Sequence, residues 1–278
     1  MHGTGSPPRS CERILRAGRP RKRWRYVGIF GEQIMACAAL VQIGPARQSF
    51  WAVSLRGGQS LEREHTRLLP RASEVRLSAG RADAGVPGEL RIEDRGVRLE
   101  LALHEQPGIE ALCASGRAQV WTRKQAGVRV EGTLAIDGGQ AAPVAALAVI
   151  DDTCGHHRRV TEWRWSAGVG RSRQGAAVAW NLVSGVNDPE HGSERAVWVE
   201  EVAAEAPPVS FAPDLSRLEC ADGSRLAFSA LSERARRERL LLLSSDYRAP
   251  FGEFSGSLPG GIELEWGLGV MEHHRARW

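Results

Sequence analysis

The feature that most constrains the fold is a period-two alternation of apolar side chains in short segments separated by turns. In residues 89–103, leucine, isoleucine and valine recur at alternate positions on both sides of Asp94-Arg95-Gly96. Because successive strand residues point to opposite faces, this stretch predicts a hairpin with one apolar and one polar face. Such segments fold by pairing with other strands rather than by packing as helices.

The same pattern, with glycine-rich turns, continues along most of the chain. Strand-like runs lie at residues 24–30, 33–41, 48–55, 143–150, 162–165, 177–182 and 196–200. Residues 119–123 and 127–136 predict a further hairpin, with residues 124–127 as its turn. Residues 232–243 (SERARRERLLLL) favour a helix by propensity, although four consecutive leucines also allow a buried strand. We therefore predict an all-β barrel or sandwich with few helices.

Composition narrows the functional classes only a little. The chain has 278 residues, a net charge of +4 and a pI near 9.0, which permits an anionic partner. Its lysines are only Lys22 and Lys124, so arginine supplies nearly all positive charge. We interpret that bias as base composition and expect no nucleic-acid partner. The segment of densest charge, residues 16–25, is interpreted as a solvated leader, with phosphate contact as the alternative.

Cysteine spacing and hydropathy indicate the cellular compartment in which the protein is expected. The five cysteines are odd in number and include no C-x-x-C pair, which argues against a disulfide framework and a structural zinc site. The basic N-terminus lacks an apolar core of the kind a secretory signal has, and the run at residues 34–43 is too short to span a bilayer. We expect a cytoplasmic protein without a transmembrane segment, whose residues 1–20 form a flexible basic arm.

Several cofactor motifs are missing from the sequence. It contains neither a G-x-x-x-x-G-K-[ST] phosphate loop nor a G-x-S-x-G elbow nor an H-E-x-x-H motif. Gly168 and Gly170 lie between strands, which is turn chemistry rather than a dinucleotide fingerprint. The carboxylates and histidines around Asp151 and Glu272 match no known ligand spacing, so we predict no metal and no cofactor.

Acid–base chemistry is better supported. A carboxylic acid among tryptophans loses solvation and can hold a proton near neutrality. We predict Asp151 or Asp152 as the acid, with His157 or His156 as its partner. The alternative is an Asx-type turn in which the aspartates bond their own backbone. Glu272 and His273 form a second acid–base pair, unless the chain terminus leaves them exposed.

Tryptophan and asparagine side chains in the same third of the chain could line a ligand cavity. Alternation in residues 162–165 places both of its tryptophans on one strand face. The predicted ligand-binding residues are Trp163, Trp165, Trp180, Asn181, Asn187 and Trp198. The alternative is that the tryptophans only fill the interior of a barrel.

Four segments together resemble a known family: RKRWRYVGIFGE, DDTCGHHRRVTEWRWSAGVG, VAWNLVSGVNDP and the C-terminal stretch from LLLLSSDY to HHRARW. They are similar to the uncharacterised domain-of-unknown-function family 2804, over residues 21–278. More remotely, the arrangement is similar to the superfamily of carotenoid 1,2-hydratase and AttH-type proteins. This resemblance implies two lipocalin-like antiparallel barrels, at residues 21–142 and 143–278, and an apolar pocket. His156 departs from the family motif, which makes His157 the better choice.

Three functions follow as hypotheses. The first is a hydratase, dehydratase or isomerase acting on an isoprenoid, polyketide or lipid-like molecule through Asp151 or Asp152 with His157. The second is a carrier of such a ligand without catalysis. The third is a binder of nucleic acid or an anionic surface through residues 16–25. Neither the substrate nor the oligomeric state follows from the sequence.

Overall fold

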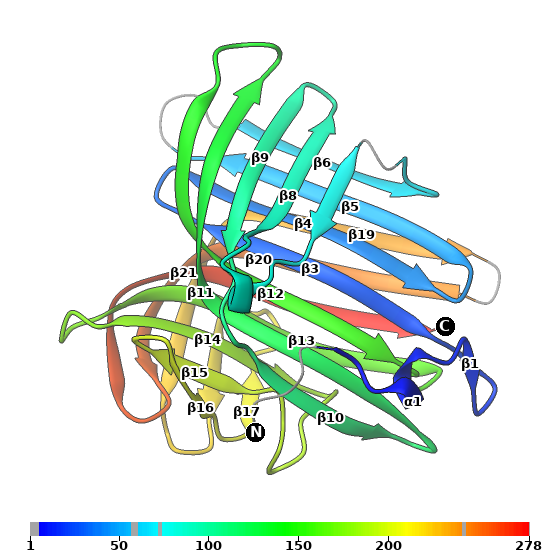
Figure 1. Ribbon diagram of the computed structural model, residues 1–278. Helices are drawn as coiled ribbons and strands as arrows, with labels where there is room; N and C mark the ends of the chain where they lie inside the picture. The colour runs from blue at the N-terminus through cyan, green and yellow to red at the C-terminus, as the bar shows by residue number, and fades with distance from the viewer. Residues whose placement is uncertain (1–5, 57–60, 72–73, 241–242, 278) are drawn as a thin grey trace.

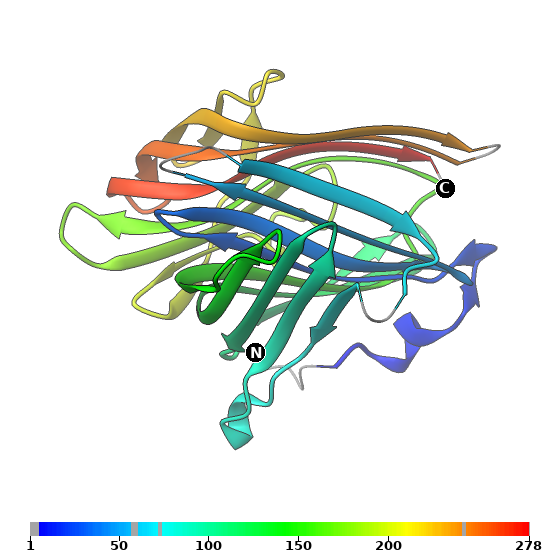
Figure 2. The same cartoon turned by 90° about the horizontal axis from the view of Figure 1, so that it is seen from above.

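The computed structural model describes residues 6–56, 61–71, 74–240 and 243–277 and consists almost entirely of antiparallel strands. Two sheets curl into half-barrels that pack against each other (Figures 1 and 2). The prediction of an all-β, lipocalin-like fold with few helices is confirmed. Helical turns in the described residues are α1 (Arg9–Glu12) and a 3₁₀ turn at Ala82–Ala84.

The first sheet has the order β6-β5-β4-β3-β12-β11-β9-β8-β7, with β10 also paired to β11. Its strands are β3 (Lys22–Phe30), β4 (Ile34–Ile43), β5 (Ala46–Leu55), β6 (Leu61–Leu68), β7 (Val75–Ser78), β8 (Gly88–Asp94), β9 (Val97–His104), β10 (Ile109–Ser115), β11 (Ala118–Ile136) and β12 (Ala142–Gly155). Strand β12 pairs with β3 and β11, so this sheet extends past residue 142 to Gly155.

The second sheet has the order β16-β15-β14-β13-β21-β20-β19-β18-β17. Its strands are β13 (Val160–Ser172), β14 (Ala177–Ser184), β15 (Ala196–Val199), β16 (Val202–Glu205), β17 (Val209–Phe211), β18 (Arg217–Cys220), β19 (Arg225–Leu240), β20 (Leu243–Leu258) and β21 (Ile262–Arg277). Strands β13 and β21 pair with each other at the centre of this order.

Of two local predictions, one was left open by the sequence and one was wrong. Residues 232–240, for which the sequence allowed a helix or a buried strand, continue strand β19. Most of them are exposed and Arg234 is buried, so the strand is not a fully buried one; Leu241 and Leu242 lie outside the described residues. The hairpin expected across residues 124–127 is a single strand, β11, with a bulge between Ala126 and Val128. Gly127 has φ +74°, so the glycine serves the bulge rather than a turn.

Strand alternation sorts the apolar side chains into three cores. One fills the first half-barrel and contains Val27 and Ile150; another fills the second and contains Trp180. The third lies between the two sheets and contains Tyr26, Val149 and residues of the second sheet. Because neighbouring residues of a strand enter different cores, every second residue of β3, β12 and β13 faces the interface between the sheets.

Candidate functional site

Strand β12 sends its two consecutive aspartates to opposite faces of the first sheet. Asp152 has the same parity as Ile150 and lies on the inner face of the half-barrel, where it accepts hydrogen bonds from Arg25 (2.7 Å) and Arg123 (3.1 Å). Both arginines also bind Glu105. Two arginines and two carboxylates therefore balance one another on this face, and the geometry is that of a structural ion-pair network.

Asp151 has the parity of Val149 and faces the interface between the sheets. Its carboxylate accepts hydrogen bonds from Trp24 Nε1 (3.0 Å) and Thr153 Oγ1 (2.9 Å). Lys124 Nζ, from the neighbouring strand β11, lies 2.7 Å from Asp151 Oδ1. The pair Asp151-Asp152 thus belongs to a regular strand, not to an Asx turn, and only Asp151 reaches the interface.

Lys124 also connects Asp151 to a carboxylate of the second half. Its Nζ lies 3.4 Å from Glu194 Oε1, and both side chains are buried. Burial disfavours the lysine charge, but the charges of Asp151 and Glu194 outweigh it and raise the pKa of Lys124 above its ordinary value. Burial, opposed by Lys124 and reinforced by the Asp151 charge, raises the pKa of Glu194. One cation thus serves two buried carboxylates.

Three predicted ligand-binding residues hold Glu194 in place. Asn187 Nδ2 donates to Glu194 Oε2 (3.1 Å), and Asn181 Nδ2 donates to the Glu194 backbone oxygen (2.7 Å). Trp165 Nε1 donates to Asn181 Oδ1 (2.8 Å). These residues come from β13, β14 and the connection to β15, so the network links the second sheet to Lys124 of the first.

Glu272, on β21, is a second buried carboxyl of the interface whose pKa is raised. It is 7 % exposed, and Trp163 Nε1 donates to its Oε1 at 2.7 Å. Burial raises the pKa of Glu272 to about 7, although hydrogen bonds from Trp163 and Tyr247 act in the opposite direction; the Asp151 charge adds to the rise. This carboxyl exchanges a proton near neutral pH, as a general acid or base requires.

Both histidine pairs are split between opposite sides of the chain. His274 packs on Trp163 and Tyr247 beside Glu272, with ring centroids 4.3 and 5.3 Å apart, whereas His273 faces outward and bonds Glu162 at 2.9 Å. His157 stacks on Trp24 at 5.1 Å, whereas His156 binds the Arg13 carbonyl. Burial lowers the pKa of both His157 and His274 to about 3, so each is neutral near pH 7.

The two remaining predicted tryptophans, Trp198 and Trp180, lie in different cores. Trp198 belongs to the core between the sheets. Trp180 points into the second half-barrel, where its Nε1 donates to Ser166 Oγ and its ring packs on Phe254. Trp180 fits the alternative that tryptophans fill the barrel. The interface brings together Asp151, His157, Glu272, Trp163, Trp165, Asn181, Asn187 and Trp198, and leaves out Asp152, His273 and Trp180.

Sequence reasoning missed the residues that set the electrostatics of the site: Lys124, Glu194, Trp24, Tyr247 and His274. One signal was available. In a chain that uses arginine almost throughout, its two lysines, Lys22 and Lys124, are both buried, at 2 and 3 % exposure. An ammonium group is a compact point charge on a flexible stem, whereas a guanidinium group is a planar fork, so the two do not replace each other in a buried ion pair. A rare lysine in an arginine-rich chain was therefore worth attention.

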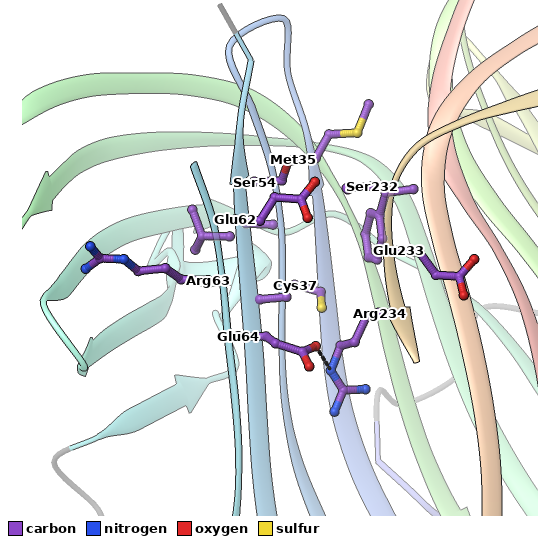
Figure 3. Close-up of a pocket in the computed structure, with 13 residues that line it drawn as sticks. Met35, Cys37, Ser54, Glu62, Arg63, Glu64, Ser232, Glu233 and Arg234 are labelled. Carbon is purple, nitrogen blue, oxygen red and sulfur yellow. Dashed lines mark ion pairs between the residues drawn. The ribbon is translucent and has the colours of Figure 1, made fainter. Parts of the chain in front are cut away.

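A hollow of about 270 Å³ opens beside this interface, between strands β4–β6 and β19–β20 (Figure 3). Met35, Cys37 and Phe251 form its apolar wall, and Glu64 and Arg234 lie at one end. Arg234 is buried with its guanidinium over the rings of Phe50 (4.1 Å) and Tyr247 (5.0 Å). Since Tyr247 bonds Glu272, Arg234 lies between the hollow and the carboxyl.

The fold and the interface define a protein of the lipocalin-like class that pairs two half-barrels around a buried polar site. Solved structures share the fold. An AttH-described protein from Nitrosomonas europaea aligns with a TM-score of 0.58 and 13 % identity, over 91 % of this chain and 92 % of that one. Kievitone hydratase from Nectria haematococca gives 0.59 and 11 %, over 91 % and 88 %. CghA bound to Sch210972 gives 0.53 and 11 %, over 92 % and 88 %.

The chain belongs to the family described as domain of unknown function DUF2804, whose model matches residues 89–278. A comparison with curated proteins found no match. Among the described residues, no helix is long and apolar enough to cross a membrane. The structural neighbours establish the fold alone at these identities.

Proposed function

We propose that this protein is an enzyme that adds water to a hydrophobic small molecule, removes water from it, or shifts a double bond within it, with Glu272 transferring the proton. The observation that carries the proposal is the placement of Glu272: a buried carboxyl held by Trp163 and Tyr247 in an aromatic interface that also contains the Asp151 carboxylate. Kievitone hydratase is a water-adding enzyme by name, and its shared fold supports the same class of reaction.

The chemistry follows from the two carboxyl groups. A neutral Glu272 donates its proton to one carbon of a double bond, and the oxygen of a water molecule bonds to the other carbon. That water loses a proton to a carboxylate, for which Asp151 is the choice among the predicted residues. Asp151 then releases this proton to solvent, and Glu272 regains a proton from solvent. Dehydration is the reverse sequence. In an isomerisation, a proton leaves a different carbon and no water adds.

Trp24, Trp163 and Trp165 give this chemistry an apolar setting. Each indole donates a hydrogen bond to a polar group of the site and presents its ring to the interface. Such rings bind apolar molecules while the few polar groups orient them. We infer that the ligand is isoprenoid, polyketide or lipid-like, and that it enters through the hollow beside Arg234.

Isotope labelling tests the proposal although the substrate is unidentified. Wild-type protein is incubated with an organic extract in H₂¹⁸O and separately in D₂O, and the products are compared by mass spectrometry. A new compound containing ¹⁸O indicates hydration, a product lighter than its substrate by the mass of one water molecule indicates dehydration, and deuterium gain without ¹⁸O indicates isomerisation. Native mass spectrometry and extraction of the purified protein identify any ligand that remains bound.

A matched pair of variants assigns the role of Glu272. Glu272→Gln should lose at least a hundredfold in turnover, as loss of a general acid typically does. Glu162→Gln changes a carboxyl of the same sheet that faces outward, and should retain wild-type turnover. A ligand that is bound but never altered by the wild type would establish the carrier hypothesis instead. Equal turnover in the two variants would remove Glu272 from the mechanism.

A further inference from the structure

Positive charge is concentrated at one end of the molecule. Residues 9–25 contain seven arginines, one lysine and one glutamate, a net charge of +7, whereas the whole chain carries +4. The rest of the chain is therefore net negative. A preference for arginine over lysine explains which cation the chain uses, but it does not explain this segregation of charge.

The N-terminal segment is folded onto the first sheet. After α1, strands β1 (Leu15–Arg16) and β2 (Arg19–Pro20) form a small hairpin. Cys11 is buried against Trp121 and Cys154, and the Arg21 carbonyl accepts a hydrogen bond from Gly44 N at 2.8 Å. Figures 1 and 2 show the hairpin at the same end of the molecule as the C-terminus. Six of the seven arginines are thereby held at a fixed surface, whereas Lys22 is buried and Arg25 pairs with Asp152 and Glu105 inside the half-barrel.

Exposed aliphatic side chains accompany these arginines. Ile14 (73 % exposed) and Leu15 (63 %) lie at the hairpin, and Leu68 (59 %) and Leu69 (77 %) lie at the end of β6. Three backbone hydrogen bonds lead from one pair to the other across the edge of the sheet. Arg21 N donates to Ile14 O, Gly44 N donates to Arg21 O, and Leu69 N donates to Arg47 O. Among the other large apolar residues that the structure describes, only Val202 is as exposed as these four. These backbone hydrogen bonds place the two aliphatic pairs at one edge of the first sheet, separated by the start of β3 and the β4–β5 turn, and exposed aliphatic residues at such an edge are typical of an interaction site.

We propose that this docking edge, formed by Arg13, Ile14, Leu15, Arg16, Leu68 and Leu69, binds the surface of an anionic lipid bilayer. Aliphatic residues enter the boundary between headgroups and acyl chains, and arginines around them pair with anionic headgroups. The exposed apolar residues of the edge are aliphatic, not aromatic, and so offer no stacking platform for nucleotide bases. This inference does not depend on the proposed reaction.

Vesicle co-sedimentation of the full chain tests the edge. The wild type should bind vesicles of phosphatidylcholine containing phosphatidylglycerol, release from them at high salt, and bind poorly to phosphatidylcholine alone. The double variant Arg13→Gln, Arg16→Gln should bind the anionic vesicles roughly tenfold or more weakly, since each arginine contributes about a fivefold gain near such a surface. The control is the double variant Arg171→Gln, Arg173→Gln, which changes two arginines at the C-terminal end of β13, away from the docking edge. It should bind like the wild type.

A second double variant separates apolar insertion from charge. Ile14→Ser with Leu15→Ser should weaken binding to anionic vesicles by at least tenfold while leaving the melting temperature unchanged, because both residues are exposed. The control is Val202→Ser. Wild-type binding that is equal on neutral and anionic vesicles, or unaffected by the Ile14 and Leu15 changes, would overturn the proposal. So would failure to bind vesicles together with salt-sensitive retention of a duplex DNA oligonucleotide.

Discussion

Strand β12 carries two adjacent aspartates that have opposite surroundings. Asp152 lies in a network of two arginines and two carboxylates, so every charge has a partner of the opposite sign. Asp151 lies where one buried lysine serves two carboxylates and where Glu272 is close enough to be influenced by its charge. A balanced network fixes the fold, whereas an excess of buried carboxyls must retain protons.

This contrast assigns chemistry to one face of the sheet and structure to the other. Burying an ion pair is costly unless each charge is compensated. The Asp152 side meets that condition. On the Asp151 side the raised pKa of Glu194 and Glu272 is the consequence of incomplete compensation, and such perturbed groups concentrate at functional sites.

The largest expected effect comes from removing Lys124, the cation shared by Asp151 and Glu194. Lys124→Met keeps the length of the side chain but leaves Asp151 and Glu194 without their shared partner, and should lower the free energy of unfolding at neutral pH by about 3–5 kcal/mol. Arg123→Met, on the opposite face, leaves Arg25 to pair with both carboxylates and should cost about 1–3 kcal/mol. Urea unfolding compares them. Equal losses would show that the two faces do not differ.

Glu272→Gln gives the next largest effect, and it depends on pH. In the folded protein the pKa of Glu272 is about 7, against an ordinary value of 4.5. The folded state therefore keeps a proton that the unfolded chain releases, and this carboxyl makes the wild type lose stability as pH rises from 4.5 to 7. The glutamine variant lacks that loss, so its stability relative to the wild type should rise by about 3 kcal/mol across this window.

Unfolding by urea at a series of pH values checks the sign as well as the size. A relative stability that is constant with pH would mean that Glu272 titrates normally. Turnover provides an independent check, because a neutral general acid becomes scarce above its pKa. The rate should therefore decline as pH rises above about 7.

Substitution of the two aspartates compares the two faces of β12 directly, and its expected effects are of intermediate size. Asp152→Asn removes an acceptor of two arginines and should cost about 2 kcal/mol, with turnover and its pH profile unchanged. Asp151→Asn removes the carboxylate proposed to accept the proton of water, so turnover should fall. It also removes a like charge that raises the pKa of Glu272, so the pH profile of the remaining turnover should move to lower pH. If Asp152→Asn moved the profile instead, the assignment of the two faces would be reversed.

The fold was predictable because period-two alternation is local. Residues such as Leu90, Ile92 and Leu99 identify strands and their buried face whichever strand pairs with them. The failures arose where a local signal had two interpretations. Residues 232–240 have helix propensity but form a paired strand, and Gly127 marks a bulge rather than a hairpin turn.

The site was predictable only in part, because its assembly depends on register between distant strands. Alternation alone states that Asp151 and Asp152 face apart, but not which of them meets the second sheet. Placing residues 124–127 in a turn hid Lys124, which is a direct cross-strand partner of Asp151. Glu194 follows an irregular connection and reaches Lys124 only through packing of the two halves. No periodicity indicates such a contact.

The smallest expected effect concerns the contact between Glu162 and His273, the outward-facing histidine of the second pair. Glu162 and His273 form an ion pair at 2.9 Å, with side-chain exposures of 45 and 32 %, and this contact lowers the pKa of Glu162. Solvent screens such a pair, so Glu162→Gln should cost less than about 1 kcal/mol. Its sign is opposite to that of Glu272, because a lowered carboxyl pKa gives stability that is lost as pH falls. Because the ion pair needs a protonated histidine, urea unfolding near pH 4 and pH 6 should show a small deficit at pH 6 that shrinks at pH 4. A deficit as large as that of Lys124→Met, or a loss of turnover, would mean that the outer face of β13 and β21 takes part in the site after all.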